Sequence, residues 1–198
     1  VSVTAEKTGC DPAQVLSLST EIYDVIESNG TGGGDWLTTS TWDCDCVPSS
    51  TDNILINPLD VVTHTTNNTD LTMKHLTIET GGELQMNKLN NDVIITGNFE
   101  LDGSIYLSES GTNLVFSSTS TSTVIDGFGI IIIEDDGQVQ IDKNRTISPT
   151  SILTISNTAT GEVVLGAGVT ITNQGTIQFI APVSGGNAWV NDDNSILE

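Results

Sequence analysis

The sequence predicts an all-β fold, a right-handed parallel β-helix in which short strands wind into a solenoid behind an N-terminal capping segment. Three observations favour this class. The 198-residue chain is only 36% apolar and 5% aromatic, with 19 glycines, which is typical of β-rich proteins with many turns. Short apolar segments recur from residue 53 onwards. Glycines and Asp-Gly pairs separate these segments, as tight corners require.

The first 50 residues are predicted to form an N-terminal segment and the cap of the solenoid. Within it, DPAQVLSLST at residues 11 to 20 favours a short helix, because Asp11 can cap the first turn and Pro12 suits its first position. The polar, glycine-rich SNGTGGG at residues 28 to 34 is predicted to be a loop.

The cap itself is assigned to GGGDWLTTSTWDCDCVP at residues 32 to 48. A solenoid has an open strand edge at each end, and an uncovered edge promotes aggregation. Trp36 and Trp42 are large side chains just before the first coil, and Pro48 closes the stretch. The two tryptophans are therefore expected to plug the end of the core. The alternative is that they form a platform on which a sugar ring stacks.

The recurring apolar segments define the coils. Their centres fall about every 6 to 10 residues, so three of them make a unit of about 20 to 25 residues, the size of one solenoid coil. Residues 53 to 182 are therefore predicted to form five or six coils, in a solenoid region spanning 51 to 198 that belongs to a longer chain. The alternative is a β-sandwich, which the shortness of the segments disfavours. The predicted strands are 54–56, 76–78, 84–86, 93–95, 99–101, 105–107, 114–116, 124–125, 130–133, 139–141, 152–155, 163–165, 169–171 and 177–179.

The charge balance excludes some partners. Five basic residues face 26 acidic ones, a formal net charge of -21, which repels the phosphates of nucleic acid. No apolar run is long enough for a membrane helix, so no membrane insertion is expected. The acidic surface has two interpretations, namely solubility in a secreted protein and binding of calcium by carboxylates. Calcium is the one cofactor that the composition suggests.

Two acidic groups are the candidate calcium ligands. The ligand types suit calcium, but Asp136-Gly137 is also a turn signal, and acids in turns are commonly solvated. The same acids, with Lys143 and Arg145 nearby, are what a β-helix polysaccharide lyase or hydrolase would use. The candidates are Glu134, Asp135, Asp136 and Asp142 in one group and Asp192 and Asp193 in the other.

Other catalytic signals are absent from the sequence. It contains no G-x-S-x-G, H-E-x-x-H or P-loop pattern. The two histidines, His64 and His75, lie in strand-like stretches and are expected to point outward into solvent. The sequence therefore predicts that the chain is not an enzyme.

The three cysteines, Cys10, Cys44 and Cys46, leave the pairing open. A Cys44–Cys46 bridge would close a very short loop, and a bridge from Cys10 to either would tie the N-terminal segment to the cap. Free thiols and a zinc site completed by a histidine are the alternatives. A disulfide would place the protein in an oxidising, extracellular compartment.

One part of the sequence resembles a known family. SNGTGGGDW, TTSTW, VPSSTDNILI, DVVTHTT and LTMKHLTIETGGELQM, within residues 28 to 86, are similar to a recurring opening of large secreted surface proteins in Bacteroidota-type bacteria. The resemblance implies β-helix coils, export by the type-nine route and a role as an adhesin, motility filament or other appendage on the bacterial cell surface. The implied partners are other domains of the same long chain, further copies in a homo-oligomer or filament, and surface glycans.

Two functions follow as expectations. The first is a structural and adhesive segment of a secreted surface protein, a stiff acidic rod that self-associates or contacts other surfaces. The alternative is a β-helix polysaccharide lyase or hydrolase, or a calcium-dependent glycan-binding module. The scarcity of aromatic residues argues against the alternative, because sugar sites favour stacked rings.

Overall fold

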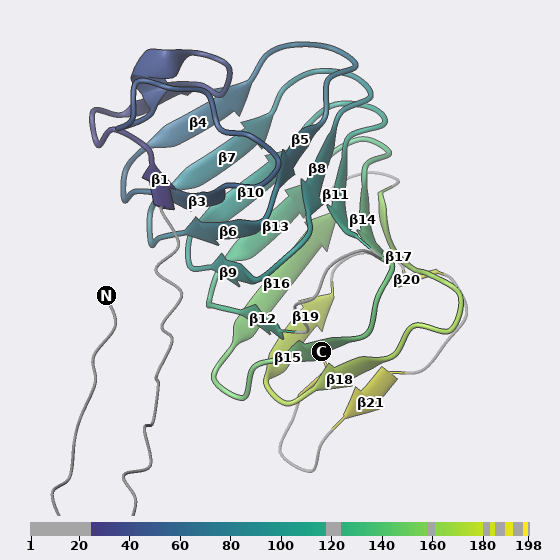
Figure 1. Cartoon of the computed structure of the whole chain (residues 1–198). Helices are drawn as coiled ribbons and strands as arrows, with labels where there is room; N and C mark the ends of the chain where they lie inside the picture. The colour runs from purple at the N-terminus through teal and green to yellow at the C-terminus, as the bar shows by residue number, and fades with distance from the viewer. Residues whose placement is uncertain are drawn as a thin grey trace, which may run out of the picture.

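The computed structural model (Figure 1) describes residues 25 to 117, 124 to 157 and 161 to 179, and the backbone of three further short strands. Cys10, the helix expected at 11 to 20, and the pair Asp192 and Asp193 lie outside the described residues. The described part is all-β, and its one helical element is the single-turn 3-10 helix η1, Thr39–Thr41.

The strands form three sheets that run along the molecule. The first sheet contains β1 (Val25–Glu27), β3 (Asn53–Ile56), β6 (His75–Ile78), β9 (Phe99–Leu101), β12 (Val124–Asp126), β15 (Arg145–Ile147), β18 (Ile171–Asn173) and β21 (Trp189–Asn191). The second contains β2 (Gly33–Asp35), β4 (Val61–His64), β7 (Glu83–Met86), β10 (Ser104–Leu107), β13 (Ile130–Ile133), β16 (Ile152–Asn157), β19 (Thr176–Phe179) and β22 (Ile196–Leu197). The third contains β5 (Leu71–Met73), β8 (Asp92–Ile95), β11 (Asn113–Phe116), β14 (Gln138–Ile141), β17 (Glu162–Leu165) and β20 (Val183–Ser184).

The chain visits the three sheets in turn, and this winding makes a parallel β-solenoid of about six turns (Figure 1). Ile171 pairs with Trp189 and Val25 pairs with Asn53, the shortest and the longest separations, so one turn takes between 18 and 28 residues. Every strand pair in the described ranges is parallel, which confirms the predicted solenoid and rules out the β-sandwich, whose strands pair antiparallel.

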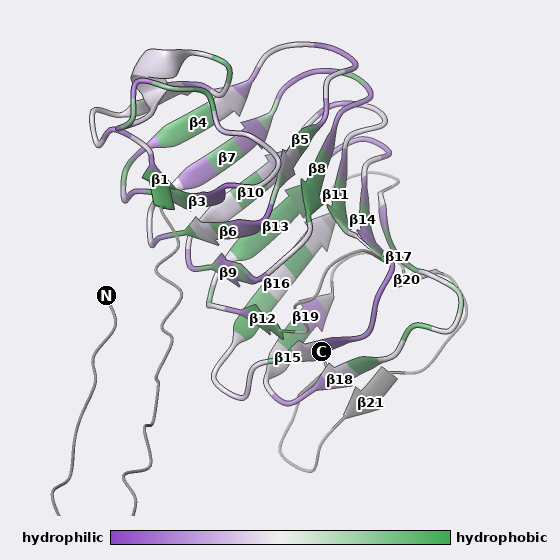
Figure 2. Ribbon diagram, in the orientation of Figure 1, coloured by the Kyte–Doolittle hydropathy of each residue, from purple (hydrophilic) through white to green (hydrophobic). Residues whose placement is uncertain are grey.

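Side-chain alternation builds the core. In β13, which is four isoleucines, Ile131 and Ile133 are buried, whereas Ile130 and Ile132 face outward. Figure 2 shows apolar and polar residues mixed along most strands, because successive side chains of a strand point to opposite faces. Since paired strands are in register, the buried positions of successive turns stack into one core that extends from Trp36 to Ile177.

Most predicted strands lie where the sequence placed them. The segments 99–101 and 130–133 are β9 and β13 without any change of boundary. The segment expected at 169–171 begins two residues later, as β18. The first two strands, β1 and β2, already pair with β3 and β4, so the sheets of the solenoid extend into the segment predicted to be only its cap.

Candidate functional site

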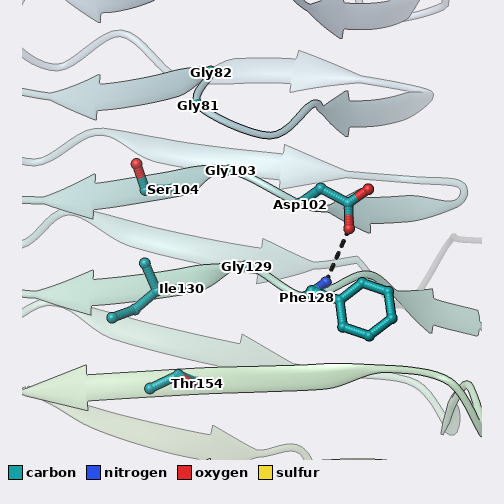
Figure 3. Close-up of a pocket in the computed structure, with 9 residues that line it drawn as sticks. All are labelled: Gly81, Gly82, Asp102, Gly103, Ser104, Phe128, Gly129, Ile130 and Thr154. Carbon is teal, nitrogen blue, oxygen red and sulfur yellow. Dashed lines mark hydrogen bonds between the residues drawn. The ribbon is translucent and has the colours of Figure 1, made fainter. Parts of the chain in front are cut away.

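A shallow hollow of about 310 Å³ opens on the outside of the solenoid, at the corner between the first and second sheets. Three glycines that precede β7, β10 and β13 form its floor on successive turns (Figure 3). The lining residues are Gly81, Gly82, Asp102, Gly103, Ser104, Phe128, Gly129, Ile130 and Thr154.

The glycines are required by the close stacking of the turns. A Cβ atom on Gly103 would lie 2.2 Å from the backbone oxygen of Gly82, and one on Gly129 would lie 2.5 Å from the backbone oxygen of Gly103. Neither distance leaves room for a methyl group. The missing side chains allow the backbones to approach closely and leave the surface concave at this corner.

Phe128 lies at the rim of the hollow and is 60% exposed, which is unusual for a phenylalanine. Its backbone N–H donates a hydrogen bond of 2.9 Å to Oδ1 of Asp102 on the preceding turn (Figure 3). Ile152 is also exposed, and it is the first residue of β16, the strand that pairs with β13 in the second sheet. The corner therefore presents apolar side chains to solvent beside a carboxylate.

A row of carboxylates lies next to the hollow. Glu100 and Asp126 occupy paired outward positions on β9 and β12. Burial raises the pKa of Glu100, and the negative charges of Asp102, Asp126 and Glu79 raise it further. An exposed aromatic ring beside carboxylate acceptors is suited to a sugar, whose ring stacks on the aromatic face while its hydroxyls donate to the acids. This hollow was not predicted from the sequence, where its only local signal is a phenylalanine between two glycines, Gly127 and Gly129.

The candidate calcium ligands that the structure describes are not brought together. Glu134, Asp135 and Asp136 form the turn after β13, where Asp135 has a positive φ of 59°, and Asp142 follows β14. Asp136 accepts a hydrogen bond from the N–H of Gly111. Hydrogen bonds from the Ser110 side chain and from Gly111 lower the pKa of Asp136.

Asp142 is engaged separately, since both of its carboxylate oxygens accept hydrogen bonds of 2.9 Å from the Gln140 side chain. Within the described ranges, no three histidine, cysteine, aspartate or glutamate side chains form a cluster that could hold a metal ion.

Arg145 is not a surface residue. It lies in β15 with 1% of its surface exposed, and its guanidinium is 5.3 Å from the centre of the Phe116 ring. The idea that Arg145 could serve a lyase site beside Asp135 and Asp136 is therefore wrong. Its role is to pack in the core, where the planar cation stacks on an aromatic face.

The two histidines differ from each other, because His75 lies on the expected outward side of its strand and His64 does not. His64 is fully buried, and its Nε2 is 2.7 Å from the backbone oxygen of Thr69, so the expected outward position is wrong. His75 is half-buried on the outward side of β6, and its Nδ1 accepts a hydrogen bond from the N–H of Asn98. Each imidazole ring is therefore hydrogen-bonded to a backbone group, His64 to that of Thr69 and His75 to that of Asn98.

The tryptophans close the N-terminal end of the core. Trp36 and Trp42 are 2% and 1% exposed, pack edge to face at 4.8 Å, and are joined by a hydrogen bond from Trp42 Nε1 to the backbone oxygen of Trp36. They are plugs, as predicted, and their burial rules out the sugar-stacking platform. Pro48 is half-buried, in the largely exposed connection that leads to β3.

A buried acid, Asp60, anchors the glycine-rich loop of the cap. Its carboxylate accepts hydrogen bonds from the N–H groups of Gly30 and Gly32, at 2.9 and 2.8 Å. Burial alone would raise the pKa of Asp60, but hydrogen bonds from Ser28 and from the loop backbone outweigh it and lower the pKa. The role of Asp60 could not be predicted from the sequence, because its hydrogen-bond partners lie about one turn away.

Cys44 and Cys46 form a disulfide with each other, with their Cα atoms 5.1 Å apart. Of the alternatives left open by the sequence, the structure thus contains the shortest bridge. Neither a Cys10 bridge to this pair nor zinc bound by its thiolates is compatible with that pairing.

Comparison of the chain with protein-family models, with curated proteins and with solved structures finds no match. The functional argument therefore depends on the residues and geometry described above. No helix within the described ranges is long and apolar enough to cross a membrane.

Proposed function

We propose that this chain is a structural and adhesive segment of a secreted bacterial surface protein or extracellular appendage, of the Bacteroidota type that residues 28 to 86 resemble. The observation that carries the proposal is the continuous core, which runs from Trp36 to Ile177 and is plugged at the N-terminal end by Trp36 and Trp42. Solenoids of this kind supply length and stiffness, because each turn contacts only its neighbours and stacking extends the same core.

The acidic surface fits this role. A net charge of -21 on 198 residues keeps such a rod soluble and prevents uncontrolled side-to-side contact. Cations from the medium, calcium among them, would reduce this repulsion and allow copies to approach each other. The proposed partners are neighbouring domains of the same long chain, further copies in a homo-oligomer or filament, and glycans of other surfaces.

Electron microscopy combined with light scattering tests the structural role, on this chain alone and on native secreted material. We expect rods with a constant width, and fibres, rings or bundles in the native material. Compact particles with no assembly in either sample would contradict the proposal.

A second candidate function is glycan binding, and the exposed ring of Phe128 beside Asp102 in the hollow favours it. Calorimetric titration with oligosaccharides, in the presence and absence of calcium, would detect such binding. Phe128→Ala should weaken it by about 5-fold, since stacking on an aromatic ring contributes about 1 kcal/mol. Leu89→Ala, which removes another exposed apolar side chain on a different corner, is the matched control and should leave the affinity unchanged. Equal glycan affinities for the two variants would exclude the hollow as the binding site.

A further inference from the structure

We propose that the Cys44–Cys46 disulfide is a thiol-exchange site that accepts a thiol carried in positively charged surroundings on a partner protein. This inference goes beyond the structural role proposed above and does not depend on it. It follows from the position of the bridge, from the bonds that hold the cap without it, and from the acids that flank it.

The bridge lies on the outside of the cap, between η1 and β3. Cys44 is exposed and Cys46 is half-buried. Only Asp45 separates them, and Asp45 has a positive φ of 52°. The N–H of Cys46 donates a hydrogen bond of 3.2 Å to Sγ of Cys44. The bridge therefore closes a single tight turn and joins no two elements of the fold.

Other bonds hold the cap in place. The N–H of Asp43 donates to the backbone oxygen of Glu27 at 2.9 Å, and the N–H of Asp45 donates to the backbone oxygen of Trp42 at 3.2 Å. Trp42 is in turn buried and bonded to Trp36. A disulfide that spans so few residues also restricts the unfolded chain less than one that closes a long loop. Cleavage of the Cys44–Cys46 bond should therefore leave the fold intact, whereas cleavage of a disulfide that joins two elements of a fold destabilises it.

The chemistry is an ordinary exchange. The thiolate of the partner attacks Sγ of exposed Cys44, a new sulfur–sulfur bond forms, and the Cys44–Cys46 bond breaks. Cys46 leaves as a thiolate and takes a proton from water, so no external oxidant or reductant is needed. Because Cys46 stays only two residues away, it can attack the mixed disulfide and release the partner again. The exchange is thus reversible, and a lasting link requires that the partner be held by other contacts.

Charge selects the partner. Asp43 and Asp45 adjoin the two cysteines in the sequence and are both exposed, and one Asp43 carboxylate oxygen accepts a hydrogen bond from the N–H of Glu27, another exposed acid. A thiol that carries a carboxylate is repelled from this turn, whereas a thiol beside an ammonium group is attracted. Small anionic thiols therefore react poorly, and a cysteine beside lysine or arginine reacts well.

The test uses the Cys10→Ser chain, so that the bridge holds the two remaining cysteines. Cysteamine, an ammonium thiol, and 3-mercaptopropionate, a carboxylate thiol, are compared at equal thiolate concentration by mass spectrometry of the mixed disulfide. Each rate is divided by the rate of the same thiol with the neutral 2-hydroxyethyl disulfide, because intrinsic nucleophilicity varies with the thiol pKa, and the rates below are these relative rates. We expect cysteamine to react about 10-fold faster at low ionic strength, because its charge meets two nearby carboxylates. In 1 M salt the ratio should fall towards about 2-fold, since the Debye length is then about 3 Å.

Two further variants complete the design. In Asp43→Asn/Asp45→Asn the difference between the two thiols should largely vanish while circular dichroism stays unchanged. In Cys44→Ser/Cys46→Ser, made in the same background, no thiol should be taken up and the thermal transition should be retained. If Cys10→Ser does not fold, Cys10→Ala takes its place.

Three results would overturn the proposal. They are two free thiols in the folded Cys10→Ser chain, reaction only under denaturing conditions, and equal rates for the two thiols at low ionic strength. None of them depends on whether the chain assembles, so failure of the exchange site and failure of the structural role are distinguishable.

Discussion

At the scale of single residues, Glu100 is the clearest case of a charge that its surroundings disfavour. Its pKa is raised by burial and then by Asp102, Asp126 and Glu79. The folded state therefore binds a proton more tightly than the unfolded state, and stability falls as the pH rises through the raised pKa. Because the side chain is largely exposed, solvent screening limits the effect to about 0.5 kcal/mol or less.

Glu100→Gln should therefore raise the melting temperature at pH 7 and give no gain at pH 3.5, where the carboxyl is protonated in both states. Glu109→Gln removes the same unit of charge outside this cluster and serves as the control for the global effect. Equal gains for the two variants at pH 7 would show that local repulsion at Glu100 is negligible.

His75 gives a pH dependence of the opposite sign. Burial lowers its pKa below the ordinary value of 6.5, and the positive charge of Lys74 lowers it further. Stability should therefore fall as the pH drops below about 6.5, because the unfolded state takes up the proton first. Protonation of Nδ1 would also remove the acceptor of the Asn98 N–H.

Urea unfolding at pH 7.5 and 5.5 measures this loss, which should be below about 1 kcal/mol for a partly exposed group. The loss should be smaller in His75→Asn, which keeps an acceptor but cannot be protonated in this range. An identical loss in both proteins would mean that other groups cause it.

At the scale of elements, the corner glycines set how closely the turns stack. Gly103→Ala would place a methyl group 2.2 Å from the backbone oxygen of Gly82, which the backbone can relieve only by separating β7 from β10. We expect a loss of about 2 to 4 kcal/mol in the free energy of unfolding, as for other overpacked sites. Chemical denaturation of this variant and of Gly166→Ala provides the comparison. In Gly166→Ala, the atom nearest to the added Cβ is a side-chain oxygen of Asp142 at 3.2 Å, and this side chain can move.

The strands also show how much of the fold could be predicted from the sequence. The strands β9 and β13 were predicted with their boundaries, because alternation and apolar character are local properties of FEL and IIII. The strand β2 was missed because GGD has no apolar residue, and β15 was missed because RTI begins with a charged residue. Arg145 is buried against the Phe116 ring of an earlier turn, a partner that local sequence does not reveal.

The hollow was unpredictable for a related reason. Gly82, Gly103 and Gly129 become neighbours only when the register between turns is fixed, and turn length varies along the chain. The parallel pairing of the strands, by contrast, followed from repeated short segments, which do not depend on any single register.

At the scale of the whole molecule, the charge of -21 decides how the chain responds to cations. Since no carboxylate cluster in the described ranges is arranged to hold a metal, divalent ions should act by screening. Calcium and magnesium, each at 5 mM, should then raise the melting temperature equally and by a few degrees at most. Asp135→Asn/Asp136→Asn should not change the response. A larger effect of calcium, lost in this variant, would restore the predicted calcium site at that turn.

The parallel stacking of the turns has a mechanical consequence. The hydrogen bonds between neighbouring turns point along the axis of the coil, so a pull applied between its two ends stretches them end on, a few at a time. Each turn that detaches frees between 18 and 28 residues, which extend by about 3.3 to 3.6 Å each. Under tension the molecule would lengthen in discrete steps of about 60 to 100 Å and dissipate work at each one, as a tether that yields before it breaks.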